Sequence, residues 1–160
     1  MKSKIHELPK KKLHRVSKKI LILLVFFPFI FGCDAGSINY NNPNIPNYPV
    51  NLQINMSLPQ YSNLQFPGYN VKDYSQGARG IVIFNTGSGY NAFDLACPNQ
   101  AFNLCTYPLS TASSGALEAK CQCNTAENGY SLYTGQSAGQ NYPLKPYRVE
   151  INGGNLIITN

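Results

Sequence analysis

The sequence contains no tryptophan and only two histidines, His6 and His14, both near its start. Residues 15–160 therefore lack the side chain that most often acts as a general base or binds zinc. A Ser–His hydrolytic site cannot be built from those residues. The acidic residues in the later part of the chain show no spacing typical of paired catalytic carboxylates: Asp94, Glu118, Glu127 and Glu150. We therefore predict that the protein is not an enzyme.

Charge is also scarce over most of the chain. The formal net charge of +6 arises from the first 19 residues, which hold eight of the 13 lysines and arginines. After residue 33, five basic and six acidic residues leave a formal charge of −1. Binding to nucleic-acid phosphates needs a basic surface. The sequence therefore excludes nucleic acid as a partner.

The basic start is followed by an apolar run that predicts export. Residues 20–32 are 13 residues in length, which is shorter than the roughly 20 apolar residues of a spanning helix. A basic segment, a short apolar segment and a small residue at the end are typical of a signal peptide, here residues 1–32. The sequence Ile30-Phe31-Gly32-Cys33 resembles a lipobox, which implies cleavage before Cys33. An ordinary secretory signal, with Cys33 as an incidental thiol, is the alternative.

The number of cysteines favours a lipid on Cys33. The chain has five cysteines, so an exported protein would keep one unpaired thiol, whereas acylation of Cys33 leaves an even number for disulfides. Two or more acyl chains, such as palmitate, give stable attachment to a membrane. We therefore predict a lipoprotein of the bacterial cell envelope, anchored to a membrane through its N-terminal lipid.

The composition changes at Cys33 and again at residue 50. Residues 33–49 are rich in asparagine and proline, have no periodicity, and predict a flexible tether. Residues 50–160 predict a single all-β domain, a small sandwich or barrel of short strands separated by glycine and asparagine turns. No segment after Cys33 has a convincing helical period. The expected strands are residues 50–56, 80–84, 90–97, 116–121, 130–133, 148–151 and 156–159.

The four remaining cysteines lie in two predicted loops, each directly after a strand. The first loop contains Cys97-Pro98-Asn99 and then Cys105, and the second contains Cys121-Gln122-Cys123-Asn124. Later come Tyr130-Ser131-Leu132, Thr134-Gly135, a Pro-Leu-Lys-Pro-Tyr segment at residues 143–147 and a closing Asn-Gly hairpin. In this order, the features of residues 80–160 resemble a Rieske iron–sulfur domain. The resemblance implies a Rieske-like β fold with its cysteine loops at one tip.

The resemblance also assigns a role to each residue of the two loops. It implies that Cys97 and Cys121 stand where the family holds one iron, and that Cys105 and Cys123 form a disulfide between the loops. The family's two histidine ligands correspond to Asn99 and Asn124. Because the raised potential of a Rieske centre depends on imidazole ligands, and a carboxamide is a poor ligand for such iron, we expect no cofactor and no metal.

Other uses of the four thiols stay open. A ferredoxin-like cluster with four thiolate ligands, or a structural zinc, would require opening the matching disulfide, and the Cys-x-Cys spacing is unusual for zinc. Without iron, Cys97 and Cys121 could form a second disulfide. Four cysteines allow three pairings, and the one that joins Cys121 to Cys123 would close a strained ring. Of the other two, the pairing Cys97–Cys121 with Cys105–Cys123 follows the resemblance.

The function expected from these features is binding. We predict a cluster-free, degenerate Rieske-like domain that acts as a binding or structural module for an envelope protein partner, because rigid loops on a β scaffold are common recognition sites. The tyrosines, all of which follow Cys33, could serve such a surface. The alternative is an electron-transfer protein, with either an atypical [2Fe–2S] cluster or a redox-active disulfide.

Overall fold

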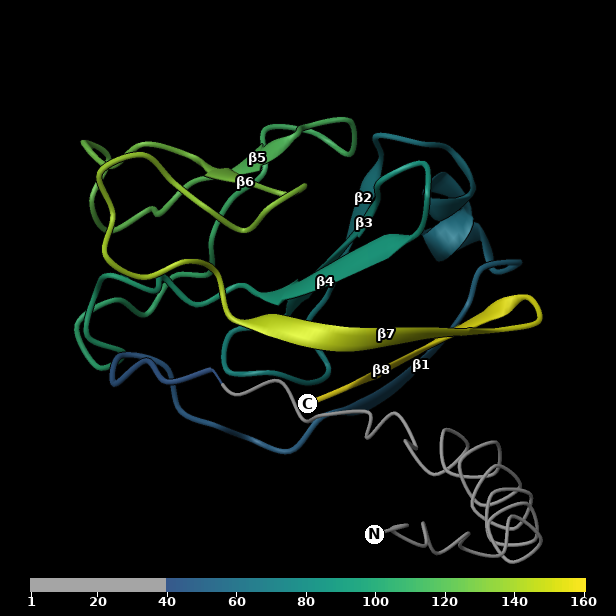
Figure 1. Ribbon diagram of the computed structural model, residues 1–160, viewed down its shortest axis with the longest axis horizontal. Coiled ribbons are helices and arrows are strands. Elements are labelled where there is room, and N and C mark those ends of the chain that lie inside the picture. The colour runs from purple at the N-terminus through teal and green to yellow at the C-terminus, as the bar shows by residue number, and fades with distance from the viewer. Residues whose placement is uncertain (1–39) are drawn as a thin grey trace, which may run out of the picture. The chain divides into compact units, whose positions relative to one another are not determined.

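The computed structural model describes residues 40–160, which fold as an all-β domain (Figure 1). Six antiparallel strands form one sheet in the order β1-β8-β7-β4-β3-β2, and β5 pairs with β6 in a second, smaller sheet. The predicted fold class is therefore confirmed. The strands are β1 (Asn51–Asn55), β2 (Asn70–Asp73), β3 (Ile81–Asn85), β4 (Tyr90–Asp94), β5 (Glu118–Ala119), β6 (Tyr130–Ser131), β7 (Pro146–Asn152) and β8 (Asn155–Thr159).

The six-stranded sheet curls, so that its two edge strands approach each other. Gln76 follows β2 and bonds Asn51 of β1 through both atoms of its amide, at 2.8 and 2.9 Å. The hydroxyl of Tyr61 donates to the carboxylate of Asp73 at the end of β2, at 2.6 Å. Tyr61 belongs to a 3-10 helix, η2 (Pro59–Gln65), which lies between β1 and β2 in the chain. These side-chain bonds occupy polar groups at the edges that could otherwise pair with another chain.

Apolar side chains leave β3 on both of its faces, so the strand is buried along its whole length. Ile81 and Ile83 join an inner cluster, whereas Val82 and Phe84 join an outer one. The inner cluster fills the curled sheet and includes Leu52, Ile54, Leu64, Leu156 and Ile158. The outer cluster lies between the sheet and the cysteine loops and includes Phe93, Leu95, Tyr130, Leu132, Leu144 and three cysteines. β3 therefore connects the two cores.

The long strands agree with the sequence-based expectations. The predicted hairpin at residues 80–97 is β3 paired with β4, and the predicted closing hairpin is β7 paired with β8. Gly153 turns between β7 and β8 with a positive φ of 61°, which glycine adopts without steric cost. Residues 50–56 contain β1, whose Leu52 and Ile54 are buried while their neighbours are exposed.

Other parts of the fold differ from those expectations. β2 and η2 were not predicted, because β2 has a single strongly apolar residue, Val71, and takes its conformation from pairing with β3. β5 and β6 are two residues each, shorter than the strands expected at 116–121 and 130–133. None of the helices within residues 40–160 is long and apolar enough to cross a membrane.

Residues 40–49, which we call the strap, correct the expectation of a flexible tether. Asn42 and Ile45 are buried against the domain. The hydroxyl of Tyr40 donates to the carbonyl of Pro143 at 2.7 Å, and the amide of Asn160 donates to the carbonyl of Tyr48 at 2.8 Å. This polar, proline-rich segment can pack against the domain because residues far along the chain form hydrogen bonds with its polar groups. The rest of the predicted tether (33–39), the predicted signal peptide (1–32) and Cys33 lie outside the described residues.

The strap also covers a buried charge. Lys145 is 3% exposed, and its ammonium donates to the carbonyl of Pro46 at 3.1 Å and to Oδ1 of Asn47 at 2.9 Å. Burial lowers the pKa of Lys145, although the negative charge of Asp94 opposes the shift. Since a buried charge needs hydrogen-bond partners, strap and Lys145 stabilise each other.

Candidate functional site

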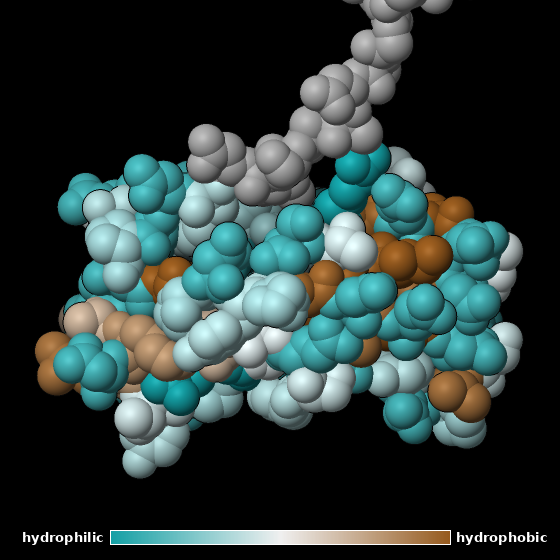
Figure 2. Space-filling model, turned by 90° about the horizontal axis from the view of Figure 1, so that it is seen from below, coloured by the Kyte–Doolittle hydropathy of each residue, from teal (hydrophilic) through white to brown (hydrophobic). Residues whose placement is uncertain are grey.

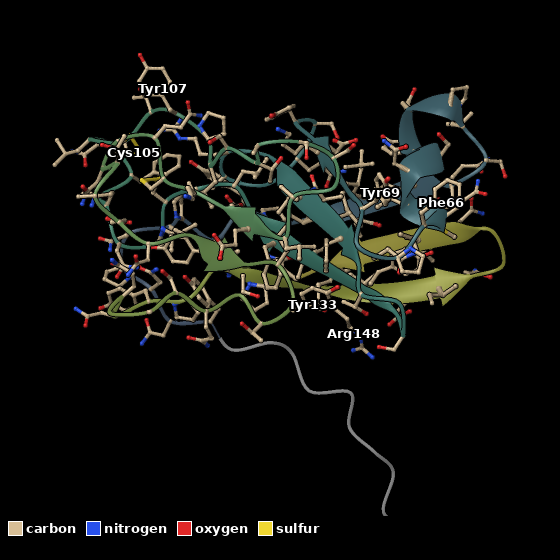
Figure 3. The ribbon with its side chains drawn as sticks, turned by 90° about the horizontal axis from the view of Figure 1, so that it is seen from above. Phe66, Tyr69, Cys105, Tyr107, Tyr133 and Arg148 are labelled. Atoms are coloured by element: carbon tan, nitrogen blue, oxygen red, sulfur yellow. A yellow bond between two sulfur atoms is a disulfide. The ribbon has the colours of Figure 1, made fainter. Side chains whose placement is uncertain are left out.

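Two disulfides join the cysteine loops at one end of the domain. Cys97 bonds to Cys121 and Cys105 bonds to Cys123, with Cα–Cα distances of 5.5 and 5.6 Å. This is the pairing that the family resemblance implied. The loops run from the end of β4 to β5 and from β5 to β6, and we refer to residues 95–109 and 120–129 together as the tip. In Figure 3, Cys105 lies at the end of the molecule away from η2.

The four sulfur atoms form a compact group with unequal access to solvent. All four Sγ atoms lie within 4.8 Å of one another. Cys97, Cys105 and Cys121 are buried, whereas Cys123 is exposed. One contact between the two disulfides joins Sγ of Cys105 to Sγ of Cys97, at 3.3 Å. A reagent in solution therefore reaches the group through Cys123.

Asn99, which the resemblance matches to the family's first histidine ligand, links two segments of the chain. Its Nδ2 donates to the carbonyl of Tyr142 at 2.8 Å and to the hydroxyl of Tyr130 at 2.9 Å. Its Oδ1 accepts from the backbone N–H of Tyr142 at 3.0 Å. The carboxamide therefore binds the first cysteine loop to the segment before β7, and both of its polar atoms are already engaged.

Asn124, which the resemblance matches to the family's second histidine ligand, makes longer hydrogen bonds than Asn99 does, and only to nearby residues of its own loop. Its Nδ2 donates to Glu127 at 3.2 Å, and its Oδ1 accepts from the backbone of Ala126 at 3.3 Å. Such a bond to a residue two positions later is typical of an asparagine turn. Asn124 therefore shapes its own loop and does not join the two loops.

Glu127 gathers polar groups from both loops. Its Oε1 accepts from Gln100 at 2.6 Å, and its Oε2 accepts from the hydroxyl of Tyr130 at 3.1 Å. Burial, and to a smaller extent the charge of Glu127, raise the pKa of Tyr130 to about 12, although the bond from Asn99 acts in the opposite direction. At neutral pH the tyrosine is a neutral hydrogen-bonded link between the two cysteine loops.

Arg79 supports the first cysteine loop through its side chain, and no sequence motif identifies this residue. Its Nη2 donates to the carbonyls of Phe102 at 2.9 Å and Cys105 at 3.2 Å, and its guanidinium lies 4.0 Å from the centre of the Phe102 ring. Its Nε is buried without a hydrogen-bond partner. No carboxylate pairs with Arg79 among residues 40–160. A positive charge therefore lies at the backbone of Cys105 without a counterion there.

Asp94 holds the segment that carries Arg79. Its fully buried carboxylate accepts from the backbone N–H groups of Ala78, Arg79 and Ala96 and from the hydroxyl of Tyr147, at 2.6 to 3.2 Å. Burial raises the pKa of Tyr147, and the charge of Asp94 adds to the shift. Asp94 therefore has a positioning role, with all of its contacts inside the protein.

Two exposed apolar side chains flank Cys105. The side chain of Leu104 is 78% exposed and that of Tyr107 is 63% exposed. Figure 3 shows Tyr107 pointing outward beyond Cys105. On the face shown in Figure 2, hydrophobic atoms form small, separate areas, and one lies at the left end, which carries the cysteine loops in Figure 1. Leu104 and Tyr107 are therefore both exposed on a loop that a disulfide cross-links.

The strap reaches the tip through Pro98, the residue after Cys97. The carbonyl of Pro98 accepts from Nδ2 of Asn42 and from Nδ2 of Asn44, both at 2.9 Å. The first cysteine loop is thus held by a disulfide at each of its cysteines, by Asn99 and by the strap. Few of its backbone groups are free to move independently.

A shallow polar groove of about 640 Å³ runs beside the second cysteine loop and β5. Glu118, Lys120 and Glu127 contribute to its lining. Glu118 and Glu127 show no motif spacing in the sequence, and the fold brings them to one surface beside the paired strands β5 and β6. Glu127 already accepts three hydrogen bonds within the tip, so its carboxylate is structural.

The residues at the tip do not fit a Rieske [2Fe–2S] cluster. The thiols that would hold one iron are bonded to each other, and the amides at the two histidine positions are engaged in hydrogen bonds. The chain has no histidine beyond His14 to replace them. The tip instead has two disulfides with their four sulfur atoms close together, and the exposed side chains of Leu104 and Tyr107 beside them.

No protein-family model and no curated protein matches the sequence. One solved structure to which the chain is similar is described as the small subunit of an NADPH nitrite reductase. The two chains are 18% identical, and the match covers 67% of this chain and 97% of that one, with a TM-score of 0.39.

Proposed function

We propose that this protein is a lipid-anchored component of the bacterial cell envelope whose disulfide-linked tip binds a protein partner, without catalytic activity and without a metal cluster. The observation that carries the binding role is the exposure of Leu104 and Tyr107 on either side of Cys105. Exposed aliphatic and aromatic side chains on a rigid loop lose little conformational entropy on binding.

The rigidity of this surface has a physical source. The disulfide of Cys105 and the hydrogen bonds from Arg79 fix the backbone between Leu104 and Tyr107. A loop ordered before binding need not be ordered by the partner, which improves affinity for a given area. This combination supports recognition of a protein surface better than it supports chemistry on a small molecule.

Membrane attachment is proposed from the sequence around Cys33. If the lipid is on Cys33, seven residue steps separate it from Tyr40 at the start of the strap, and a fully extended chain of that length spans about 25 Å. The domain would then work close to the bilayer surface. Its partner would be a membrane protein, or a protein held near a membrane.

Labelled palmitate tests the anchor. The full chain should incorporate the label and fractionate with membranes, whereas the Cys33→Ala variant should do neither. Secretion of the wild-type chain without label would support the ordinary secretory signal instead.

Site-specific photo-crosslinking in cells tests the binding surface. A photoreactive phenylalanine analogue in place of Tyr107 should yield one discrete crosslinked product, and the additional change Leu104→Ser should remove it. The matched control is the same analogue at Ile151, which is 60% exposed on β7. Equal crosslinking from both positions would contradict a binding surface at the tip.

The electron-transfer alternative is supported by the four sulfur atoms that lie within 4.8 Å of one another. Four thiolates at such distances could hold iron or zinc once both disulfides are reduced. Metal analysis and absorption spectra of the protein as purified distinguish the two functions. A brown protein with about two iron atoms per chain, as a [2Fe–2S] centre requires, would overturn the cluster-free proposal.

A further inference from the structure

We infer that the tip is a thiol–disulfide relay, in which exchange begins at exposed Cys123 and passes through Cys105 to the buried Cys97–Cys121 disulfide. The exchange consumes one disulfide of the tip and involves no catalytic turnover, and it does not depend on the proposed binding role. It rests on the unequal exposure of the two disulfides and on the 3.3 Å contact between Sγ of Cys105 and Sγ of Cys97.

The first step takes place at the accessible sulfur. A thiolate of an external dithiol attacks Sγ of Cys123, forms a mixed disulfide with it and breaks the Cys105–Cys123 bond. Cys105 leaves as a thiolate. Attack on the other disulfide from outside is hindered, because Cys97 and Cys121 are 3% and 4% exposed.

The second step is internal. The Cys105 thiolate attacks Sγ of Cys97, forms a Cys97–Cys105 disulfide and releases Cys121 as a thiolate. The second thiol of the dithiol then attacks the mixed disulfide and releases Cys123. The external dithiol is thereby oxidised by two electrons to a disulfide, and its two protons pass to Cys121 and Cys123. The tip retains one disulfide, Cys97–Cys105.

The guanidinium of Arg79 favours Cys105 as the sulfur that leaves and then attacks. It donates to the carbonyl of Cys105, has no carboxylate partner among the residues of the described domain, and keeps a buried Nε without an acceptor. A fixed positive charge at the backbone of a cysteine favours its thiolate electrostatically, and a better leaving group speeds exchange. Cys123, at the solvent end of the same disulfide, is the sulfur that an external thiolate can reach.

Partial reduction of the full chain tests the relay. The protein is treated with one equivalent of dithiothreitol, quenched in acid, alkylated and mapped by mass spectrometry. The relay predicts alkylation of Cys121 and Cys123 together with a linked pair of peptides that contain Cys97 and Cys105. Alkylation of Cys105 and Cys123, with the Cys97–Cys121 disulfide intact, would overturn it.

Two variants that each leave one free thiol provide a matched comparison without reductant. In Cys123→Ser, the free Cys105 lies against Cys97, so alkylation should appear at both Cys105 and Cys121. In Cys105→Ser, the sulfur that contacts Cys97 at 3.3 Å is removed, so alkylation should be confined to Cys123. Alkylation of Cys105 alone in the first variant would contradict the relay. The test on the wild-type chain remains decisive if either variant fails to fold.

Discussion

The curled sheet and the cysteine tip are neighbouring regions of one domain, and they are stabilised in different ways. Inside the sheet, Ile54, Leu64 and Leu156 are completely buried among other apolar side chains. In the tip, two disulfides and the amide of Asn99 connect two loops, and three of the four cysteines join the outer cluster. The sheet is stabilised by the area it removes from water, and the tip additionally by cross-links and by hydrogen bonds that have specific partners.

This difference implies that the tip depends on the sheet more than the sheet depends on the tip. β3 and β4 contribute to both cores, so the tip lies on a surface that the sheet provides. The sheet has its own inner cluster, which contains no cysteine. We therefore expect the sheet to survive loss of the tip, whereas the tip should not survive loss of the sheet.

Removing both disulfides should have the largest effect on stability. Replacing all four tip cysteines with alanine should lower the free energy of unfolding by about 2 to 4 kcal/mol per bridge, because the unfolded chain is no longer constrained. Hydrogen exchange should lose protection in residues 95–145 first, while β1 and β8 remain protected. A uniform loss of protection across the sheet would contradict the proposed independence of the sheet.

Truncating the inner cluster should have the next largest effect. Ile54→Ala should lower the free energy of unfolding by about 2 to 5 kcal/mol, because it leaves a cavity in a fully buried site. Here sheet and tip should lose protection together. Ile151→Ala, at an exposed position, is the matched control, with an expected effect below about 0.5 kcal/mol. Similar values for the two isoleucines would mean that the inner cluster is not the main source of stability.

Alkaline pH should destabilise the tip through Tyr130. Because the pKa of this buried tyrosine is raised to about 12, the folded state keeps a proton that the unfolded state releases near pH 10. Stability from this group is complete below pH 10, and about 2 to 3 kcal/mol of it should be lost between pH 10 and 12. Tyr130→Phe should flatten the decline in urea titrations at pH 9 and 12.

Other buried groups also change the free energy of unfolding with pH, so Tyr130→Phe should remove only part of the alkaline decline. Burial also raises the pKa of Tyr40 to about 12, so Tyr40 adds to the alkaline decline. The lowered pKa of Lys145 has the opposite sign, since the folded state releases that proton before the unfolded state does. Tyr107→Phe, at an exposed position, is the control, and identical profiles for the two Tyr→Phe variants would exclude Tyr130 as a source of the decline.

The smallest expected difference in the free energy of unfolding is the one between variants of Asn99 and Asn124. Asn99→Ala should cost about 1 to 3 kcal/mol, because it leaves the backbone groups of Tyr142 without their partners. Asn124→Ala should cost less than about 1 kcal/mol, because its bonds are local and long. Urea denaturation measures both, and equal losses would show that the second loop is as firmly clasped as the first.

The long strands could be predicted from the sequence because the pattern of apolar and polar residues along each strand indicates which side chains are buried. The alternation in β1 and the turn residues between β3 and β4 and between β7 and β8 are local signals. β2 carries no such signal, because its pairing with β3 arises from the tertiary fold. The cysteines were assigned to the tip from the family pattern, and no local rule chose between the two open pairings.

The strap and Arg79 were missed for a related reason. The asparagines of the strap look like spacer residues until Pro98 and Lys145 are placed beside them. Arg79 is a single basic residue before a strand, and only the folded loop brings the carbonyl of Cys105 to it. A polar side chain can be satisfied by water or by protein, and the sequence does not say which.

By itself, then, the sequence determined the all-β class, the even set of cysteines after Cys33 and the absence of histidine after His14, and it predicts an export signal. These are properties of composition and of near neighbours along the chain. Only the tertiary structure decided that residues 40–49 are part of the domain, that Cys123 alone among the tip cysteines is exposed, and that Cys105 lies against Cys97. These depend on contacts between residues far apart in the chain, which form only when the whole domain packs.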